Sequence, residues 1–376
     1  MIDRRRFLQN AAIAAAATVS APLLAARRSD DSGSGAAYEP DTLPANPEDA
    51  ARYRPPYKLG AGTTQLGNIF KVTPDAQAEA MLDAQWQAGV RYFDTSPWYG
   101  LGLSERRLGH FLDDKNPDDY VLSTKVGRLL IPDASVDSVG NWKGDLNFDY
   151  RYDYTAAGVR RSVEDSLQRL GVPKIDIVYI HDLAPSNTDF DDWREQLQIA
   201  IDGAMPELTR MREEGMIKAW GMGVNDIEPA LAALDAADPD VILQATEYSL
   251  VKHEDALDRL FPRVRENNAS VVIGAPYNAG FLAGVDRWHY GGEMPDGVID
   301  KRERLRAVAK AHDVDLRTAA LQFTAAPDVV SATIPGARNA EQAHENAASM
   351  RASIPAAFWD ELKSEGLIAE SAPTPS

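Results

Sequence analysis

Residues 88–109 read AGVRYFDTSPWYGLGLSERRLG and combine a short apolar run, a polar loop and the start of a helix. The apolar run ends at Asp94, and its β-branched and aromatic residues are typical of a buried strand. Glycines indicate a loop after it, and Ser104 is suited to be the N-cap of the helix that follows. A strand that ends in an acid and leads into a loop with a tyrosine, here Tyr99, is how barrel enzymes present catalytic groups. The alternative is that Asp94 caps a turn and Tyr99 packs beside Trp98.

The composition limits the kinds of partner that we expect. The chain has 376 residues, 44% of them hydrophobic, which suits one large barrel or two ordinary domains. Its net charge of −18 argues against a nucleic-acid partner, which would require a basic surface. The absence of cysteine excludes disulfides, thiol chemistry and thiolate metal sites. We therefore expect neither a nucleic-acid partner nor a bound metal.

The first residues differ from the rest of the chain and predict export. A basic segment with Arg5 and Arg6 precedes an Ala-rich apolar run, so residues 1–28 have the order of a secretory signal. The R-R-x-F-L pattern resembles twin-arginine signals, so we expect the twin-arginine export machinery as a partner and a periplasmic location. The apolar run is short for a membrane span, which argues against stable membrane insertion after processing; an uncleaved anchor is the alternative. Residues 29–52 are rich in small and polar residues and predict a disordered linker.

From residue 53 to 370 the pattern predicts a single α/β domain, a (β/α)8 TIM barrel. Short β-type runs alternate with helical segments, and eight strands that are each followed by a helix favour a closed barrel over an open sheet. No G-x-G-x-x-G follows the first strand, which removes the main support for a Rossmann fold. The predicted strands are 57–61, 90–94, 120–125, 175–180, 217–222, 241–245, 270–274 and 329–334. The predicted helical segments are 75–88, 104–114, 155–170, 192–214, 227–236, 253–267, 302–325, 339–349 and 355–366.

Two connections, 127–154 and 275–300, are unusually long and rich in aromatic residues. Long loops in a compact domain are functional or disordered, and this aromatic content argues against disorder. We expect both segments to fold over the mouth of the barrel. Trp142 in the first of them, together with Trp98, is expected to contact the substrate.

Two further strands end in residues that can carry chemistry, Lys125 and His181. The carboxyl ends of barrel strands share one face, so both residues should lie beside Asp94. Alone, either could be an ordinary solvated or hydrogen-bonded residue. Together with Tyr99 they suit hydride transfer, because a carbonyl that receives hydride needs a proton and a phenol with a pKa of about 10 is a poor donor. A neighbouring ammonium should lower that pKa, a carboxylate should hold the ammonium, and the imidazole can orient the substrate oxygen.

Residues 94–109 resemble the D-T-x-x-x-Y-G-x-G-x-S-E-x-x-L-G signature of the aldo/keto reductases at every fixed position. By this resemblance, Tyr99, Lys125, Asp94 and His181 match the family's catalytic tetrad. The likeness covers about residues 56–350 and is strongest to the branch that contains aldose and pyridoxal dehydrogenases. The segments that carry this branch likeness are 122–130, 161–171, 223–226, 247–250 and 276–282.

The resemblance also implies a nicotinamide cofactor, NADP or NAD. Tyr248 should stack on the nicotinamide, and Asn225 and Gln244 should bind its carboxamide. A solvent-facing Arg338 and a core-packed Tyr248 are the alternatives. Arg338 favours NADP because it offers a cation for a 2′-phosphate. The residues expected at the phosphates and adenosine are Pro276, Gly280 and Leu282 in one loop, and Gly336, Arg338, Gln342 and Asn346 at the last helix.

The sequence therefore predicts an NAD(P)-dependent oxidoreductase that acts on a small carbonyl or alcohol, with an aldose as the expected substrate. General aldehyde or ketone reduction is the alternative within this class. A non-catalytic nucleotide-binding accessory protein is the alternative outside it, and the complete tetrad argues against that function.

Overall fold

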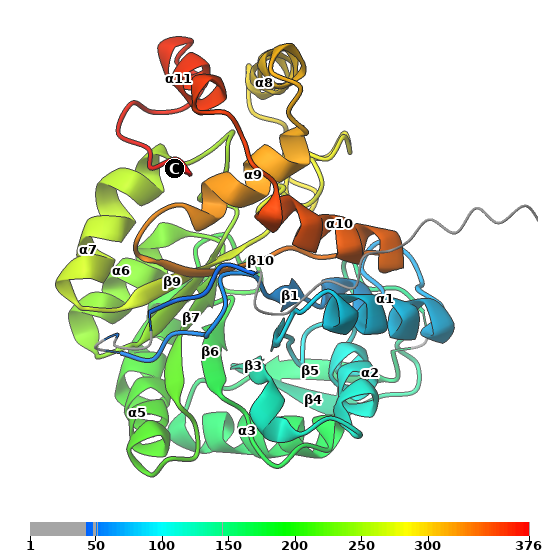
Figure 1. Cartoon of the computed structure of the whole chain (residues 1–376). Helices are drawn as coiled ribbons and strands as arrows, with labels where there is room; N and C mark the ends of the chain where they lie inside the picture. The colour runs from blue at the N-terminus through cyan, green and yellow to red at the C-terminus, as the bar shows by residue number, and fades with distance from the viewer. Residues whose placement is uncertain (1–42, 48–49, 51, 145, 376) are drawn as a thin grey trace, which may run out of the picture. The chain divides into compact units, whose positions relative to one another are not determined.

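Eight short parallel strands form the wall of a barrel in the computed structural model, which describes residues 43–47, 50, 52–144 and 146–375 (Figure 1). Neighbouring strands follow the order of the chain, and a parallel bridge between Gly62 and Gly336 links the first strand to the segment after the last. The predicted fold class is thus confirmed. The strands are β1 (Ala61–Gly62), β2 (Tyr92–Asp94), β3 (Val121–Val126), β6 (Ile177–His181), β7 (Ala219–Val224), β8 (Val241–Ala245), β9 (Ser270–Gly274) and β10 (Val330–Ile334).

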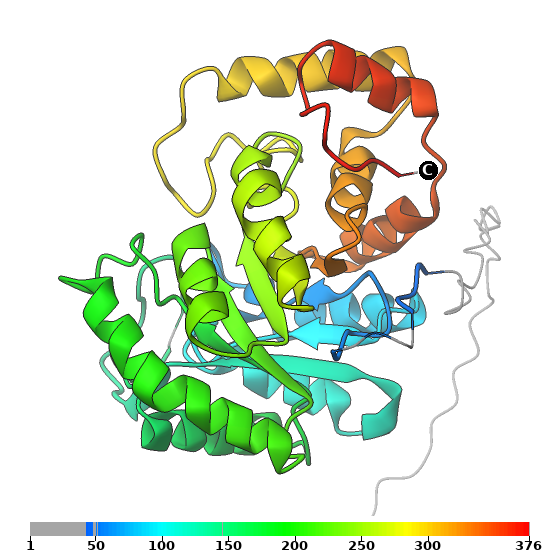
Figure 2. The same cartoon turned by 90° about the vertical axis from the view of Figure 1, so that its left-hand side faces the viewer.

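Helices cover the outside of these strands (Figures 1 and 2). Every residue of the eight strands is buried, because one face points into the barrel and the other lies under helices. The strands therefore show no alternation of buried and exposed residues, and the polar side chains that they carry, such as Ser123 and Lys125, are buried as well. The helices are α1 (Asp75–Gln87), α2 (Leu103–Leu112), α3 (Ala156–Leu170), α4 (Trp193–Ile199), α5 (Met205–Glu213), α6 (Ile227–Ala236), α7 (Phe261–Glu266), α8 (Val298–Ala311), α9 (Leu316–Ala325), α10 (Ala340–Arg351) and α11 (Ala356–Ser364).

The predicted helical segment 302–325 is two helices, α8 and α9. Asp313 between them adopts the left-handed conformation, with a φ of 56°. The Asp315 carboxylate then accepts the backbone N–H groups of Arg317 and Thr318 and caps α9. Apolar periodicity continues across this break, which is why the sequence pattern did not reveal it. Figure 2 shows α8 beside α11, outside the ring of barrel helices.

The long connection 127–154 contains an antiparallel hairpin, β4 (Arg128–Pro132) and β5 (Phe148–Tyr152). Its tip packs Trp142 and Leu146 against Ile69 and Leu101, so the hairpin has a small core of its own. The other long connection consists of turns up to the start of α8.

The predicted disordered linker 29–52 is wrong for the part that the structure describes. Leu43 is 3% exposed in the main core. The Asn46 amide donates 2.6 Å to the carbonyl of Ser331, and Ala45 forms a bridge with Tyr57. These residues are anchored by backbone pairing that composition does not report. The predicted signal, residues 1–28, lies outside the described residues.

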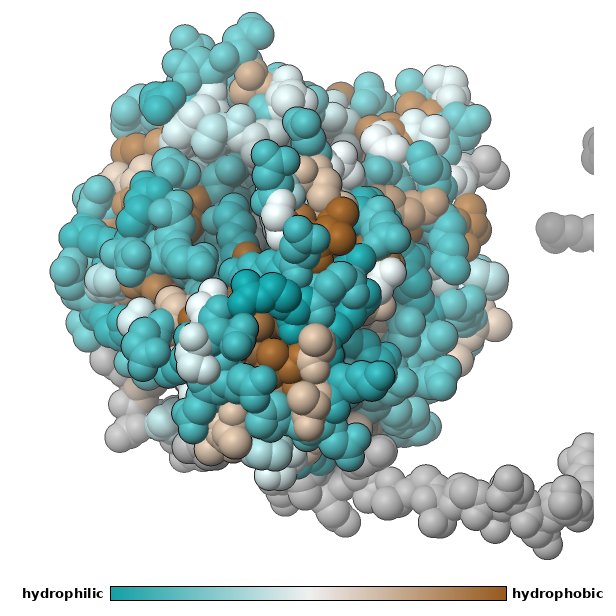
Figure 3. Space-filling view, turned by 90° about the horizontal axis from the view of Figure 1, so that it is seen from above, coloured by the Kyte–Doolittle hydropathy of each residue, from teal (hydrophilic) through white to brown (hydrophobic). Residues whose placement is uncertain are grey.

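The described surface presents its large apolar side chains singly. They come from separate elements, and the face seen in Figure 3 is mostly hydrophilic with small hydrophobic groups. Among the residues with a described structure, no helix has the length and apolar character needed to cross a membrane. The exposed large hydrophobic residues are Val72, Ile131, Ile199, Met216, Val285 and Ile299.

Candidate active site

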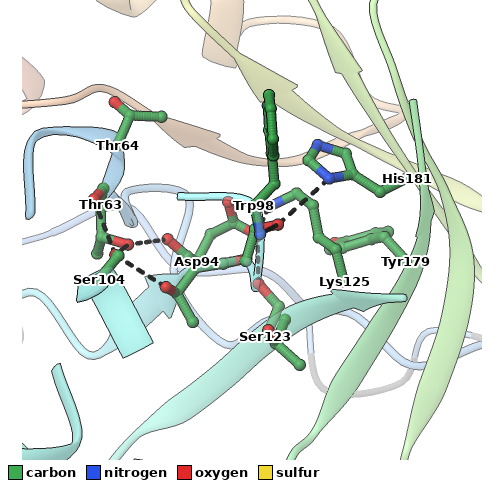
Figure 4. A network of polar contacts seen from close by, with 12 residues as sticks. Thr63, Thr64, Asp94, Trp98, Ser104, Ser123, Lys125, Tyr179 and His181 are labelled. Atoms are coloured by element: carbon green, nitrogen blue, oxygen red, sulfur yellow. Dashed lines mark hydrogen bonds and ion pairs between the residues drawn. The ribbon is translucent and has the colours of Figure 1, made fainter. Parts of the chain in front are cut away.

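Three adjacent strands bring the predicted catalytic residues together. Asp94 ends β2, Lys125 lies one residue before the end of β3, and His181 ends β6. The strands pair in that order, so the three side chains meet at one end of the barrel, as predicted (Figure 4). Tyr99 joins them from the loop after β2, with its ring centre 4.6 Å from the Lys125 ammonium and 6.0 Å from the His181 ring.

Lys125 and Asp94 form a buried ion pair. Lys125 Nζ donates to Asp94 Oδ2 at 2.7 Å and to the carbonyl of Thr95 at 2.8 Å, and its side chain is 1% exposed. Burial lowers the pKa of Lys125, and Asp94 opposes that shift. The ammonium therefore depends on this carboxylate to stay charged.

A chain of hydroxyl groups supports Asp94 from inside the barrel. Ser123 Oγ donates to Asp94 Oδ1 at 2.7 Å and lies 3.1 Å from the Tyr92 hydroxyl, which is 3.2 Å from that of Tyr179. An ionised carboxylate only accepts, so the chain donates in one direction, from Tyr179 toward Asp94. Burial raises the pKa of Asp94, whereas Lys125 and Ser123 lower it.

Ser104 does not cap the helix as predicted. Gly102 occupies the N-cap position of α2 in a left-handed conformation, with a φ of 83°. Ser104 lies inside the helix, and its hydroxyl donates 3.0 Å to the carbonyl of Thr63 and lies 2.9 Å from the hydroxyl of Thr95. This part of the motif holds the loop behind Asp94 (Figure 4).

His181 is neutral at physiological pH. Burial lowers its pKa to about 3, opposed by Asp182. Its Nδ1 lies 3.2 Å from Ser96 Oγ, which in turn accepts the N–H of Trp98 at 3.1 Å. The Ser96 hydroxyl can therefore donate to Nδ1, which leaves the Nε2–H of His181 as the donor.

The prediction that Lys125 lowers the pKa of Tyr99 is wrong for this structure. Burial, followed by the charge of Asp94, raises the pKa of Tyr99 well above its ordinary value. The Tyr99 side chain is half-buried and no hydrogen bond joins its phenol to the described residues around it, so burial dominates the shift of its pKa. Tyr99 is thus a protonated donor at neutral pH.

Two cavities meet at Tyr99. The first, which we call the inner cavity, has a volume of about 260 Å³ and reaches Lys125 and His181. The second, the outer cavity, has a volume of about 300 Å³ and extends to α10. Both are lined by Thr64, Ile69, Tyr99, Leu243, Ala245 and Tyr290, so they form one continuous space.

Trp98 and Trp142, the residues expected to contact the substrate, line the inner cavity. The Trp142 ring lies 5.5 Å from that of Tyr99 and 5.9 Å from that of Trp98. Trp142 is also 3% exposed and belongs to the core of the hairpin. It is therefore a wall of the cavity and a structural residue at once.

Most of the predicted cofactor residues line the cavities. The Nη1 atom of Arg338 is buried and has no hydrogen-bond partner among the residues that the structure describes. The backbone N–H of Arg338 donates to Gln342 Oε1 at 2.9 Å. Tyr277 donates to Asn346 Oδ1 at 2.8 Å, which orients that amide. The predicted residues that line the outer cavity are Pro276, Gly280, Gly336, Arg338, Gln342 and Asn346, and Asn225 lines the inner cavity.

Sequence reasoning missed two further arginines at the outer cavity, Arg287 and Arg317, of which Arg317 is ion-paired with Asp315 and Glu345. The Arg287 guanidinium lies 3.7 Å from the ring centre of Phe70 and donates to the carbonyl of Ala279 at 2.7 Å. Within the described part of the chain, neither Arg287 nor Arg338 forms an ion pair, although the protein is strongly acidic. Burial, and then the charge of Arg287, lower the pKa of Arg338. Two uncompensated guanidiniums at one cavity fit the phosphates of a nicotinamide dinucleotide.

Three predicted cofactor residues lie elsewhere. Gln244 is completely buried and donates to the carbonyl of Val224 at 3.2 Å, because in β8 the residues that face the cavity are its neighbours Leu243 and Ala245. Tyr248 is 1% exposed, and its ring stacks on that of Phe323 at 5.0 Å, so the core-packed alternative holds.

Leu282 also lies outside the cavity lining, buried in the main core. Its N–H donates to the carbonyl of Tyr277 at 3.1 Å, as does that of Gly280. In this conformation of the loop these two N–H groups are therefore already bonded within the loop. The guanidiniums of Arg287 and Arg338, which line the outer cavity, would be the donors for a bound pyrophosphate.

Fold and site together define an NAD(P)-dependent oxidoreductase built on a barrel. A proton donor, an ion pair and a neutral imidazole surround one end of a cavity whose other end suits a dinucleotide. Comparison with known proteins agrees with this class. Residues 58–365 match the model of the aldo/keto reductase family, and the chain belongs to that family.

Two curated relatives are each 37% identical to this chain over 327 residues. One is a D-threo-aldose 1-dehydrogenase from Pseudomonas sp, with 84% of this chain and 95% of the relative covered. The other is a pyridoxal 4-dehydrogenase from Microbacterium luteolum, with 82% and 94% covered. Among solved structures, an aldo-keto reductase from Bacillus halodurans in its holo form has a TM-score of 0.62 at 24% identity, covering 84% of this chain and 93% of that one. At this identity the structural likeness supports the fold alone.

Proposed function

We propose that the protein is an aldose dehydrogenase that oxidises the hemiacetal carbon of a sugar with a nicotinamide cofactor. The observation that carries the proposal is the lining of the inner cavity. Polar groups that can bind hydroxyls, at His181, Asp182 and Asn225, line the same cavity as the aromatic rings of Trp98 and Trp142. Polar groups beside aromatic faces suit a polyol, whereas bulky carbonyl compounds would need a more apolar cavity.

The reaction removes a hydride from C1 of the hemiacetal and a proton from its hydroxyl, which leaves a lactone. When bound, the nicotinamide dinucleotide accepts that hydride. Tyr99 stands where the proton must move, Lys125 and Asp94 set the charge beside it, and His181 Nε2–H orients the reacting oxygen. In the opposite direction, Tyr99 gives its proton to a carbonyl oxygen.

Aldehyde reduction is the second candidate, and one observation favours it. Tyr99 is protonated in this structure, so the resting site is ready for reduction rather than for oxidation. Assay of a panel of aldoses and simple aldehydes in both directions, with NAD and NADP, distinguishes the two. Turnover of aldoses with a much higher kcat/KM than that of simple aldehydes supports the proposal, and the reverse order contradicts it.

For the cofactor we favour NADP over NAD. Arg338 and Arg287 offer two cations, and a 2′-phosphate adds negative charge beyond that of the pyrophosphate. A pyrophosphate clamp would use the same arginines, so the preference rests on their number.

We further propose that the enzyme is exported by the twin-arginine route and works in the periplasm with a retained cofactor. This route carries folded proteins, and free nicotinamide should be scarce outside the cytoplasm. Three loops meet at the cavities: Phe70 donates its N–H to the carbonyl of Asn141 at 2.7 Å, and the Asn141 amide donates to that of Tyr290 at 2.8 Å. These links, with Arg287 stacked on Phe70, support slow release of a bound dinucleotide.

A further inference from the structure

A buried ion pair lies next to His181 and has no part in the proton transfer described above. Arg128 Nη1 donates to Asp182 Oδ2 at 2.8 Å, and Asp182 Oδ1 lies 3.4 Å from His181 Nε2. The Arg128 side chain is 5% exposed and that of Asp182 is 19% exposed. Asp182 lines the inner cavity, and Arg128 lies behind it.

Aromatic rings fix the arginine. Its guanidinium carbon lies 4.4 Å from the ring centre of Trp98 and 4.7 Å from that of Tyr152, and Nη2 donates to the Tyr152 hydroxyl at 2.7 Å. Such stacking restricts a planar guanidinium to one orientation. Arg128 therefore holds the Asp182 carboxylate in one position.

Asp182 has an unusual backbone conformation in addition to a largely buried carboxylate. Its φ is 47°, in the left-handed region that residues with a side chain rarely adopt. Buried ion pairs contribute little to stability compared with apolar packing, and strained backbone is concentrated at functional sites. The buried ion pair and the strained backbone are both explained if the Asp182 carboxylate has a function at this point of the cavity.

The carboxylate has acceptor capacity that the described residues leave unused. A carboxylate can accept about four hydrogen bonds. Arg128 fills one position on Oδ2, and His181 approaches Oδ1 without a close hydrogen bond. Burial raises the pKa of Asp182, but His181 and Arg128 outweigh it and the pKa lies below its usual value, so the group is ionised at neutral pH. An ionised acceptor open to a cavity is suited to a hydroxyl group.

We propose that Asp182 is a specificity residue that accepts a hydrogen bond from the hydroxyl on the carbon next to the reacting carbon, and that Arg128 is its positioning residue. His181 orients the reacting oxygen, and Asp182 lies directly beside it, so the two oxygens of an α-hydroxy carbonyl or hemiacetal fit the pair. The inference rests on the proposed function for the place of the reaction. It adds the substrate class: compounds with a hydroxyl adjacent to the oxidised or reduced carbon.

The wild-type enzyme tests this without any variant. Lactaldehyde and propanal differ only in the adjacent hydroxyl, and we expect kcat/KM for lactaldehyde to be higher by about 10²-fold, since a site built for a hydroxyl rejects the analogue without it. An aldose and its 2-deoxy counterpart form a second pair, whose binding is followed by quenching of tryptophan fluorescence from Trp98 and Trp142. Equal values within each pair overturn the inference.

Substitution of the carboxylate assigns the effect. We expect Asp182→Asn to reduce the preference for the hydroxylated member of each pair to less than about tenfold, because a neutral amide is a weaker acceptor. Asp189→Asn is the matched control: it removes the same charge from an exposed aspartate that accepts the Tyr152 hydroxyl at 2.9 Å but does not line the cavity. The control should keep the wild-type preference. An equal loss for both members in Asp182→Asn overturns the inference and makes Asp182 a support for His181.

Arg128 is tested through the same ratio. Arg128→Met should raise KM for lactaldehyde and leave that for propanal nearly unchanged, and Arg128→Lys should restore part of the preference because it retains the charge. Identical effects of Met and Lys on both aldehydes contradict a positioning role. Each variant is first compared with the wild type by thermal unfolding, and the binding measurement on wild-type protein decides the inference if a variant does not fold. Absence of turnover for every carbonyl compound would instead contradict the proposed function, and the binding pair would still test Asp182.

Discussion

The Lys125 ammonium and the Asp94 carboxylate form an ion pair 2.7 Å long in the interior of the barrel, with both side chains at most 2% exposed. Each has few other partners, so removal of one leaves a buried uncompensated charge. Their strands are neighbours, and the hydroxyl of Ser123, from the same strand as Lys125, completes the set around Asp94. This arrangement places the Lys125 ammonium 4.6 Å from the ring centre of Tyr99.

Replacement of Tyr99 by Phe should lower kcat by roughly 10²–10⁴-fold, the usual contribution of a positioned proton donor. The ring remains, so the affinity for the nicotinamide dinucleotide, measured by fluorescence titration, should not change. A variant with near-wild-type kcat would show that another group transfers the proton.

Ser123→Ala should shift the acid limb of the pH profile of kcat/KM toward higher pH. Ser123 donates to the charged form of Asp94, so its loss raises the pKa of that carboxyl and protonates it earlier as the pH falls. We expect about a tenfold loss on the acid side, in line with a hydrogen bond to a charged group. Tyr92→Phe, which leaves Ser123 in place, should cause a smaller shift in the same direction. An unchanged acid limb in both variants would indicate that Asp94 does not control the profile.

Trp142→Ala should reduce stability as well as change substrate preference. The sequence predicts a segment that folds over the barrel mouth, and in the structure the Trp142 side chain is also buried in the hairpin core. Truncation of a buried tryptophan costs about 3–5 kcal/mol, which denaturant unfolding measures. The exposed Ile131→Ala in the same hairpin is the control and should cost far less. If Trp142→Ala has the free energy of unfolding of the wild type, Trp142 covers the cavity without supporting the fold.

Arg338→Ala should weaken NADPH binding by about tenfold or more and NADH binding much less, if its guanidinium contacts the 2′-phosphate. Titration of both reduced nucleotides gives the ratio directly, and Arg287→Ala provides the comparison. An equal loss for the two nucleotides would identify Arg338 as a pyrophosphate contact. No loss for either would place the dinucleotide elsewhere.

Arg5→Lys combined with Arg6→Lys should retain the protein in the cytoplasm, because the twin-arginine route requires the arginine pair. Cell fractionation measures this, and mass spectrometry of periplasmic protein should detect bound nicotinamide. Export of the double variant would contradict the twin-arginine route. Periplasmic protein without nucleotide would contradict cofactor retention and leave the assignment of Tyr99 unaffected.

The local pattern was sufficient to predict the barrel and the meeting of Asp94, Lys125 and His181. Each residue lies at the end of a predicted strand, and in a parallel barrel the carboxyl ends of all strands lie on one face. Tyr99 follows from the loop that joins Asp94 to the next helix. No long-range information was needed, because strand order in this fold follows chain order.

The local pattern could not predict which face of a strand a side chain occupies, or which residues from distant parts of the sequence come into contact. Gln244 and Ala245 differ by one position, and a shift of one residue along a strand exchanges the cavity face for the outer face. Tyr248 is in the core because Phe323, far along the chain, covers its ring. Arg128 meets Asp182 across 54 residues, and Arg287 reaches the same cavity as Arg338 through a loop of turns. Apolar periodicity determines where strands and helices form, whereas the partners of a buried charge depend on how those elements pack in space, which is why these pairs became visible only in the folded chain.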